Sequence, residues 1–81
     1  MPRYYFHVRD GIDSFDAEGT ECATPADARA QALRTAGAIL VESSASFWRH
    51  PHWQMSVVDD AGAPVLTLTL RAQIPSEENS P

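Results

Sequence analysis

The chain has 81 residues and a net charge of −5, from eleven acidic and six basic side chains. A chain this short fits one domain with a small core, and its single cysteine excludes an internal disulfide. The acidic balance disfavours nucleic-acid binding, which needs a basic surface, and the chain contains no apolar run long enough to cross a membrane.

The first predicted element is a strand over residues 3–9, where aromatic and β-branched side chains alternate with polar ones. The side chains expected to face a core are Tyr4, Phe6 and Val8. Tyr5 and His7 would lie on the opposite face, which makes them candidate interface residues.

Residues 10–18 are rich in Gly, Asp and Ser and predict a loop, with Phe15 packed beneath it. Residues 19–22 predict a short edge strand. Cys22 would be a small, partly buried apolar residue of that strand.

A helix is predicted over residues 25–42. Thr24 can cap its first turn, Pro25 suits the first helical position, and Asp27 complements the positive end of the helix dipole. An apolar stripe, rich in alanine, recurs at helical spacing and should face the sheet: Ala28, Ala32, Leu33, Ala36, Ile39 and Leu40.

The stretch FWRHPHWQM, residues 47–55, holds both tryptophans and two of the three histidines. The large side chains predicted to anchor it in the core or in a dimer interface are Phe47, Trp48, Trp53 and Met55. Residues 50–52 would form the turn between these anchors. The alternative is an exposed platform for a ligand or partner, with Trp48, Arg49 and Trp53 as candidate contact residues.

Two further strands, at residues 53–59 and 65–70, would form a hairpin whose turn contains Gly62. The predicted fold is a single α+β domain over residues 1–73 in β-β-α-β-β order. It has an antiparallel three- to four-stranded sheet with the helix packed on one face. Residues 74–81 are polar, contain two prolines and predict a disordered tail.

The sheet face opposite the helix would stay uncovered within one chain. It would carry Tyr5, His7, Val65 and the threonines of the last strand, and would therefore be half apolar. An open face of this kind on a small domain favours self-association, so we predict a homodimer.

Five features occur together and in a fixed order: the opening MPRYYFHVRDG, DAEG at residues 16–19, the alanine-rich helix, an FW…W-x-M segment and the C-terminal hairpin. This combination resembles a family of small bacterial proteins known only as a domain of unknown function. The resemblance covers about residues 1–72 and implies a stand-alone cytosolic protein. It does not imply any particular activity or any site residues. The insert His50-Pro51-His52 lies outside the family pattern. A looser likeness, of fold alone, is to antitoxin partner proteins of the HicB type.

Residue types alone suggest two kinds of chemistry. His50 and His52 could share a metal ion in an extended segment, but two imidazoles are too few for a tight site. Cys22 with His7, His50 or His52 would supply a nucleophile and a base, but no motif brings them together.

We therefore predict a non-catalytic, cytoplasmic interaction or structural module that binds no cofactor, no nucleic acid and no membrane, and that acts as a homodimer. The absence of a signal peptide and the lone thiol favour the cytoplasm. An unidentified protein partner stays open as an alternative. So does small-ligand or metal binding by the segment that contains Trp48, His50, His52 and Trp53.

Overall fold

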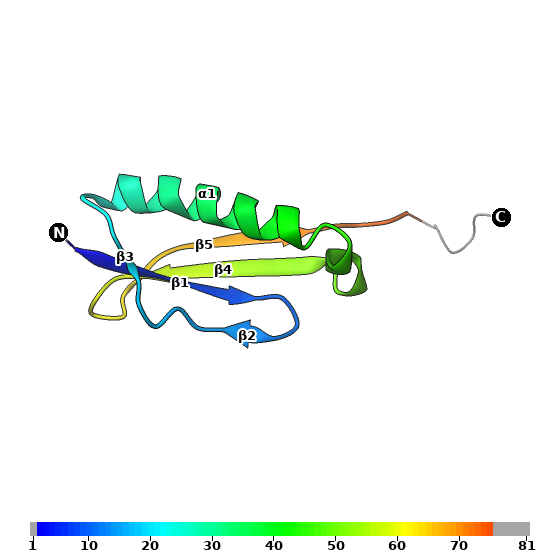
Figure 1. Ribbon diagram of the computed structural model, residues 1–81, viewed down its shortest axis with the longest axis horizontal. Coiled ribbons are helices and arrows are strands. Elements are labelled where there is room, and N and C mark those ends of the chain that lie inside the picture. Colours follow the sequence, from blue (N-terminus) through cyan, green and yellow to red (C-terminus); the bar gives the residue numbers. More distant parts are fainter. Residues whose placement is uncertain (1, 76–81) are drawn as a thin grey trace.

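The computed structural model describes residues 2–75. Its elements are β1 (Arg3–Arg9), β2 (Asp13–Ser14), β3 (Thr20–Glu21), α1 (Pro25–Glu42), the 3-10 helix η1 (Ser46–Arg49), β4 (His52–Val58) and β5 (Pro64–Arg71). All strand pairs are antiparallel, and α1 lies across one face of the sheet (Figure 1). The predicted α+β class is therefore confirmed. Most of the predicted disordered tail, from residue 76 onwards, lies outside the described residues.

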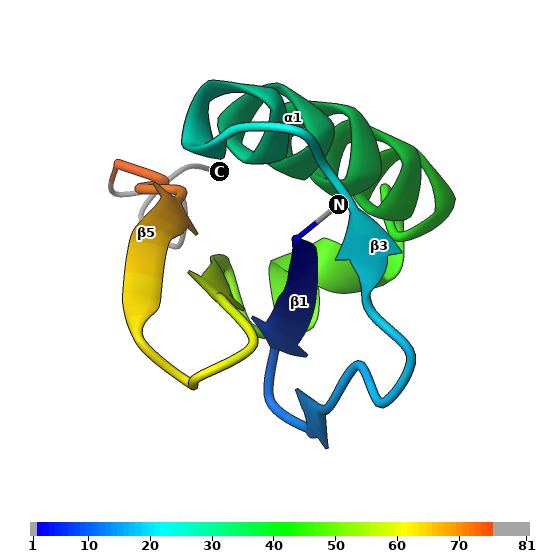
Figure 2. The same ribbon diagram turned by 90° about the vertical axis from the view of Figure 1, so that its left-hand side faces the viewer.

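The sheet has the strand order β2-β1-β4-β5, and β3 also pairs with β1. Figure 2 looks along the strands and shows β5 at one edge, with β1 and β3 toward the other. The sequence predicted three or four strands, whereas the sheet has five, because Asp13 and Ser14 pair with Arg9 and Val8. Two residues are too few to display an alternating pattern, so composition predicted only a loop there.

The core lies between α1 and the inward faces of the three long strands. Its buried side chains are Tyr4, Phe6, Cys22, Ala28, Ala32, Ala36, Trp53, Met55 and Val57. Alanines on the helix allow its backbone to lie close to the large strand side chains. The predicted helix stripe is correct except for Leu33, which is 65% exposed. Leu33 follows the buried Ala32 by one residue, a rotation of about 100° that moves it to the flank of the helix.

The start of α1 has the capped geometry that its sequence predicts. Thr24 has an extended backbone, and its Oγ1 accepts a hydrogen bond from the N–H of Asp27 at 3.1 Å. Replacing Thr24 by alanine is expected to lower the free energy of unfolding by about 1 kcal/mol, because a first-turn donor loses its partner. Urea denaturation followed by circular dichroism measures this change. Thr24→Ser keeps the hydroxyl and should stay within about 0.5 kcal/mol of wild type; a loss as large as that of alanine would contradict the capping role.

The segment between β2 and β3 is held against β1 by Asp16. Its Oδ2 accepts from the N–H of Phe6 at 3.1 Å, and its Oδ1 accepts from the N–H groups of Glu18 and Gly19 at 3.2 and 3.0 Å. The N–H of Asp16 in turn donates to Nδ1 of His7 at 3.0 Å. One carboxylate therefore satisfies a strand donor that neither β2 nor β3 reaches, and it also closes the turn before β3.

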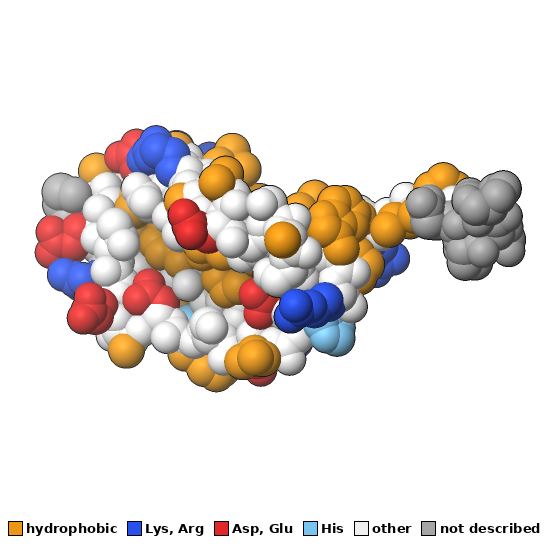
Figure 3. Space-filling view, turned by 45° about the vertical axis from the view of Figure 1, so that its right-hand side comes forward, with side chains coloured by type: hydrophobic (Ala, Val, Ile, Leu, Met, Phe, Trp, Pro, Cys, Tyr) orange, Lys and Arg blue, Asp and Glu red, His pale blue; other side chains and the backbone are white. Residues whose placement is uncertain are grey.

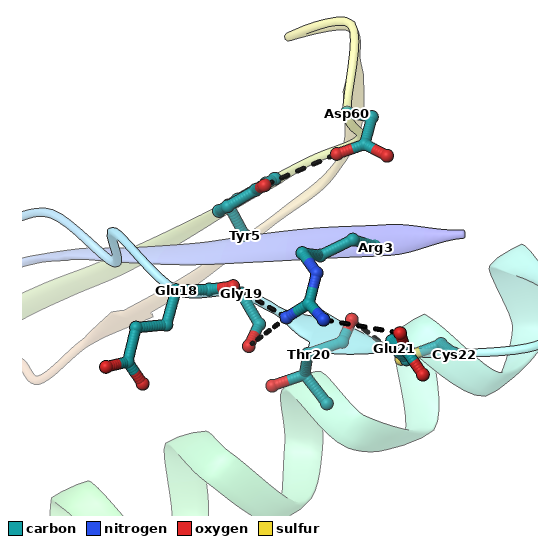
Figure 4. Close-up of polar contacts among 8 residues, drawn as sticks. All are labelled: Arg3, Tyr5, Glu18, Gly19, Thr20, Glu21, Cys22 and Asp60. Carbon is teal, nitrogen blue, oxygen red and sulfur yellow. Dashed lines mark hydrogen bonds and ion pairs between the residues drawn. The ribbon is translucent and has the colours of Figure 1, made fainter. Parts of the chain in front are cut away.

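Arg3 fixes the other end of the same segment (Figure 4). Its Nη1 donates to the carbonyl oxygens of Glu18 and Gly19 at 2.7 and 3.3 Å, and its Nη2 pairs with the Glu21 carboxylate at 3.3 Å. Phe15 is 76% exposed rather than packed beneath the loop as predicted. Its ring lies edge-on to His7, with centroids 5.3 Å apart, because the bonds of Asp16 hold the loop outside the sheet.

Candidate functional site

The aromatic segment 47–55 divides between core and surface. Trp53 is 2% exposed, Met55 is fully buried, and the half-buried Phe47 packs against the core, so these three predicted anchors are confirmed. Trp48 is 52% exposed, so it does not anchor the core, and its place in a dimer interface stays a prediction. Successive residues of a 3-10 helix point about 120° apart, so η1 cannot direct both Phe47 and Trp48 into the core. The Trp48 ring instead rests edge-on against Phe47, with centroids 5.1 Å apart.

Trp48 belongs to an apolar patch beside the end of α1. The patch consists of Leu40, Phe47, Trp48, Leu70 and Ala72, which with Ser44 line a shallow groove of about 250 Å³. Leu70 lies on the helix-facing side of β5, yet it is 43% exposed. Figure 3 shows hydrophobic side chains gathered at the end of the molecule from which the chain leaves toward its C-terminus. Large exposed side chains that adjoin one another in this way are typical of interaction surfaces.

Within residues 2–75, no strand covers the outer edge of β5. The N–H of Ala72 donates to the carbonyl oxygen of Pro51 at 3.0 Å, which marks these two residues as a hydrogen-bonded pair. Bonded and non-bonded pairs alternate in an antiparallel ladder, so Thr67, Thr69 and Arg71 direct their N–H and C=O groups away from β4. No other strand of the described chain pairs with β5. An open row of backbone donors and acceptors of this kind is a template for another strand.

The opposite edge of the sheet is protected. β3 pairs with Arg3 and Tyr4 at the start of β1, and β2 pairs with Val8 and Arg9 at its end. Between them, the carboxylate of Asp16 accepts from the Phe6 N–H. The sheet therefore has one closed edge and one edge, β5, that can accept a partner.

The sheet face opposite α1 carries both polar and apolar side chains. Tyr5 and His7 lie on it as predicted, beside Gln54, Ser56, Thr67 and Thr69 of the neighbouring strands. The Tyr5 hydroxyl is 3.3 Å from Oδ1 of Asp60, and His7 holds the Asp16 backbone (Figure 4 shows the Tyr5 contact). Val65 packs against the core instead, after a register shift between Val57 and Val58. Of the side chains predicted for the open face, only Val65 is placed elsewhere, and Val58 lies on this face opposite Tyr5.

Basic side chains gather at the end of the sheet where β1 and β5 stop and β4 starts. Three arginines and two histidines line one open concavity of about 660 Å³: Arg9, Arg49, His50, His52 and Arg71. We call it the basic concavity; in Figure 3, basic and histidine side chains lie near the same end. β1 and β5 both run antiparallel to β4, so they run in the same direction and bring their terminal arginines to one end. The sequence pattern identified Arg49, His50 and His52 but missed Arg9 and Arg71. Only the strand order shows that these two arginines lie at the same end of the sheet as the others.

A second cavity, of about 320 Å³, adjoins the basic concavity and shares Gly11, Arg49 and His50 with it. Gly11 lies against the His50 ring: a Cβ built on Gly11 would be 3.3 Å from Cδ2. The β1–β2 turn and the end of η1 are therefore in contact and together line both cavities. Trp53 also lines this cavity, and its buried Nε1 has no hydrogen-bond partner among the described residues. Trp53 thus stabilises the core through apolar contacts rather than through its N–H.

The residues that a thiol-based or metal-based site would need are not brought together. Cys22 is buried, its N–H donates to the carbonyl of Pro2, and its thiol lies 3.9 Å from the carbonyl of Thr20. Cys22 lies beside the start of β1, whereas His50 lies beyond its other end, against Gly11. The rise per residue of a strand puts these two ends about 20 Å apart. Among residues 2–75, no group of three or more His, Cys, Asp or Glu side chains is arranged to hold a metal ion.

Comparison with known proteins gives one match. The model of the family described as Domain of unknown function (DUF6894) matches residues 3–71, which confirms the predicted resemblance to a small family of this kind. Searches of curated proteins and of solved structures found no match. No helix in the described part of the chain is long and apolar enough to span a membrane.

Proposed function

The chain belongs to the DUF6894 family, a domain of unknown function, and we propose that it acts as a non-catalytic structural or interaction module that forms a homodimer through β5. The observation that carries this proposal is the free outer edge of β5 beside the apolar patch. The proposal places the protein in the cytoplasm, where a free buried thiol such as Cys22 is stable.

A second copy is the partner that best fits this edge. Two β5 strands can pair antiparallel about a two-fold axis normal to the sheet, so that the outward N–H and C=O groups of Thr67, Thr69 and Arg71 all find partners. The two sheets would join into one continuous sheet, in which each side chain stays on the same face as in the single chain. Between Pro64 and Arg71, β5 alternates Leu and Thr and carries no charge, so the residues that disfavour edge pairing are confined to the two ends of the strand.

The flank of α1 above β5 fits the same arrangement. Because the axis is normal to the sheet, both helices would lie on one face, on either side of the joined edges. Leu40 lines the apolar patch on the β5 side, and Leu33, seven residues earlier, lies on the same flank with 65% exposure. A dimer would cover Leu33, Trp48 and Leu70, the large apolar side chains that the single chain leaves exposed on this side.

Light scattering coupled to size exclusion, over a range of protein concentrations, tests the proposal. We expect a dimer at high concentration whose dissociation constant rises about tenfold or more in Thr69→Pro and in Trp48→Glu. Proline at residue 69 removes an outward N–H and leaves the ladder with β4 intact. Circular dichroism verifies that both variants fold.

The matched control is Ile12→Glu, which places the same charge on a highly exposed apolar residue away from β5. This variant should dimerise like wild type. A wild-type protein that stays monomeric at millimolar concentration would overturn the proposal. So would dimerisation that is unaffected by both Thr69→Pro and Trp48→Glu.

A further inference from the structure

We propose that the basic concavity binds a small phosphorylated molecule, with Arg49 and Arg71 as the main contacts to its phosphate. The proposal does not rest on the dimer: it uses the side chain of Arg71, whereas pairing at the β5 edge uses the backbone of that residue. It starts from the placement of side chains from β1, η1, β4 and β5 around one hollow of about 660 Å³.

The charge of the concavity is opposite to that of the protein. The chain as a whole carries eleven acidic and six basic side chains, yet three of its six arginines line this one hollow. The single acidic residue of the lining, Asp13, is already paired with Arg9, whose Nε lies 3.0 Å from its Oδ1. Among the described residues, neither Arg49 nor Arg71 forms an ion pair.

Positive charges gathered without acidic partners repel one another, and an anion relieves this repulsion. The cluster is not required by the fold, since all three arginines are exposed at the ends of their elements. A surface with this many acidic groups could have supplied carboxylates to pair with them. Within the described chain no carboxylate pairs with Arg49 or Arg71, so both guanidinium groups are available to a bound anion.

The donor types favour phosphate over other anions. Each guanidinium presents a planar fork of N–H groups that matches two phosphate oxygens, and an imidazole adds a single N–H donor. A phosphate ester offers three oxygens and carries up to two negative charges, so it can contact Arg49, Arg71 and a histidine together. His52 and Arg71 are opposite one another in the β4–β5 ladder, so their side chains project on the same side.

The dimensions favour a small molecule over a nucleic acid. A single-stranded polymer needs a basic groove that follows several phosphates, usually with aromatic faces on which bases stack. Here the basic residues are confined to one end of an acidic domain, and the lining of the hollow contains no Phe, Tyr or Trp. The adjoining cavity of about 320 Å³ offers room for the organic part of a phosphate ester.

Amide-detected NMR titration of the full chain with inorganic phosphate and glycerol phosphate tests the inference, at constant ionic strength set with sodium chloride. We expect saturable shifts centred on Gly11, Arg49, His52 and Arg71. Arg49→Gln and Arg71→Gln should each weaken binding about tenfold or more, because each removes charged hydrogen bonds to the ligand.

Arg34→Gln is the matched control, since Arg34 lies on the exposed side of α1 beside Gln31 and outside the concavity. It should change the affinity by less than about twofold. Shifts no greater than those from sodium chloride alone would overturn the inference, as would equal losses in Arg34→Gln and Arg71→Gln. Tighter binding of a single-stranded oligonucleotide than of glycerol phosphate would overturn the small-molecule assignment. Thr69→Pro, designed to be monomeric without added charge, should bind phosphate like wild type.

Discussion

Gly19→Ala is expected to lower the free energy of unfolding by about 3 kcal/mol or more, a large share of the total for a domain of this size. Gly19 has φ +73°, a left-handed conformation that costs a residue with a Cβ about 1–2 kcal/mol. A Cβ at this position would also lie 2.7 Å from Cγ of Arg3 and 2.9 Å from the carbonyl oxygen of Tyr4. The Tyr4 oxygen belongs to β1 and cannot move without disturbing the sheet.

Two other glycines separate these contributions. Gly62→Ala has φ +83° but nothing within 4 Å of the new Cβ, so it should cost only about 1–2 kcal/mol. Gly37→Ala is in mid-helix, also in open space, and should stabilise by about 0.5–1 kcal/mol. Urea or thermal unfolding of the three variants measures the order. A loss in Gly19→Ala no larger than that in Gly62→Ala would show that the contact with β1 is relieved without cost.

Asp16→Asn is expected to cost about 2 kcal/mol, because the three backbone donors that its carboxylate accepts need acceptors on both oxygens. An amide has one oxygen. Whichever way it turns, its NH₂ group faces either the N–H of Phe6 or those of Glu18 and Gly19. Asp59→Asn is the control: Oδ1 of Asp59 alone accepts from Ala61 and Ala63, so an amide can keep both bonds. A cost as small as that of Asp59→Asn would contradict the role given to Asp16.

The same carboxylate predicts sensitivity to acid. Burial raises the pKa of Asp16. Hydrogen bonds from Gly19, Phe6 and Glu18, together with the Coulombic interaction with His7, lower it by more, so the pKa lies below its ordinary value. A carboxyl with a depressed pKa stabilises the fold above its unfolded pKa, and this contribution is lost as the pH falls through the folded pKa. The difference in unfolding free energy between wild type and Asp16→Asn should therefore be constant near pH 7 and shrink below about pH 4. A constant difference down to pH 2 would exclude the ionised carboxylate as its source.

Local patterns predicted the elements of this fold well. The Thr24-Pro25 start places α1 at the predicted bounds, and the alternation of residues 3–9 correctly separates Tyr4 and Phe6 from Tyr5 and His7. These features depend on residues a few positions apart, so the sequence displays them directly. Leu33 is exposed one residue from the buried Ala32, and Trp48 is exposed one residue from the half-buried Phe47. In both places turn geometry rather than hydrophobicity decides the direction of the side chain.

The candidate sites were less predictable for the same reason. The stretch 47–55 was identified from its tryptophans and histidines, but it contributes to two separate surfaces: Trp48 to the apolar patch, and Arg49 with both histidines to the basic concavity. Arg9 and Arg71 gave no signal, since each is one arginine at the end of a strand. The DAEG motif at residues 16–19 was visible in the sequence. Its structural role depends on hydrogen bonds with Phe6 and Arg3 of β1, which are distant in sequence.

The sequence by itself determined the class of the fold, the helix and its cap, and the inward faces of the long strands. Each follows from periodicity or capping chemistry within a few residues. Only the tertiary structure decided that β5 is the free edge, that Asp16 seals the other edge and that three arginines meet in one hollow. These depend on strand order and on hydrogen bonds between residues far apart in the chain, which no local pattern encodes.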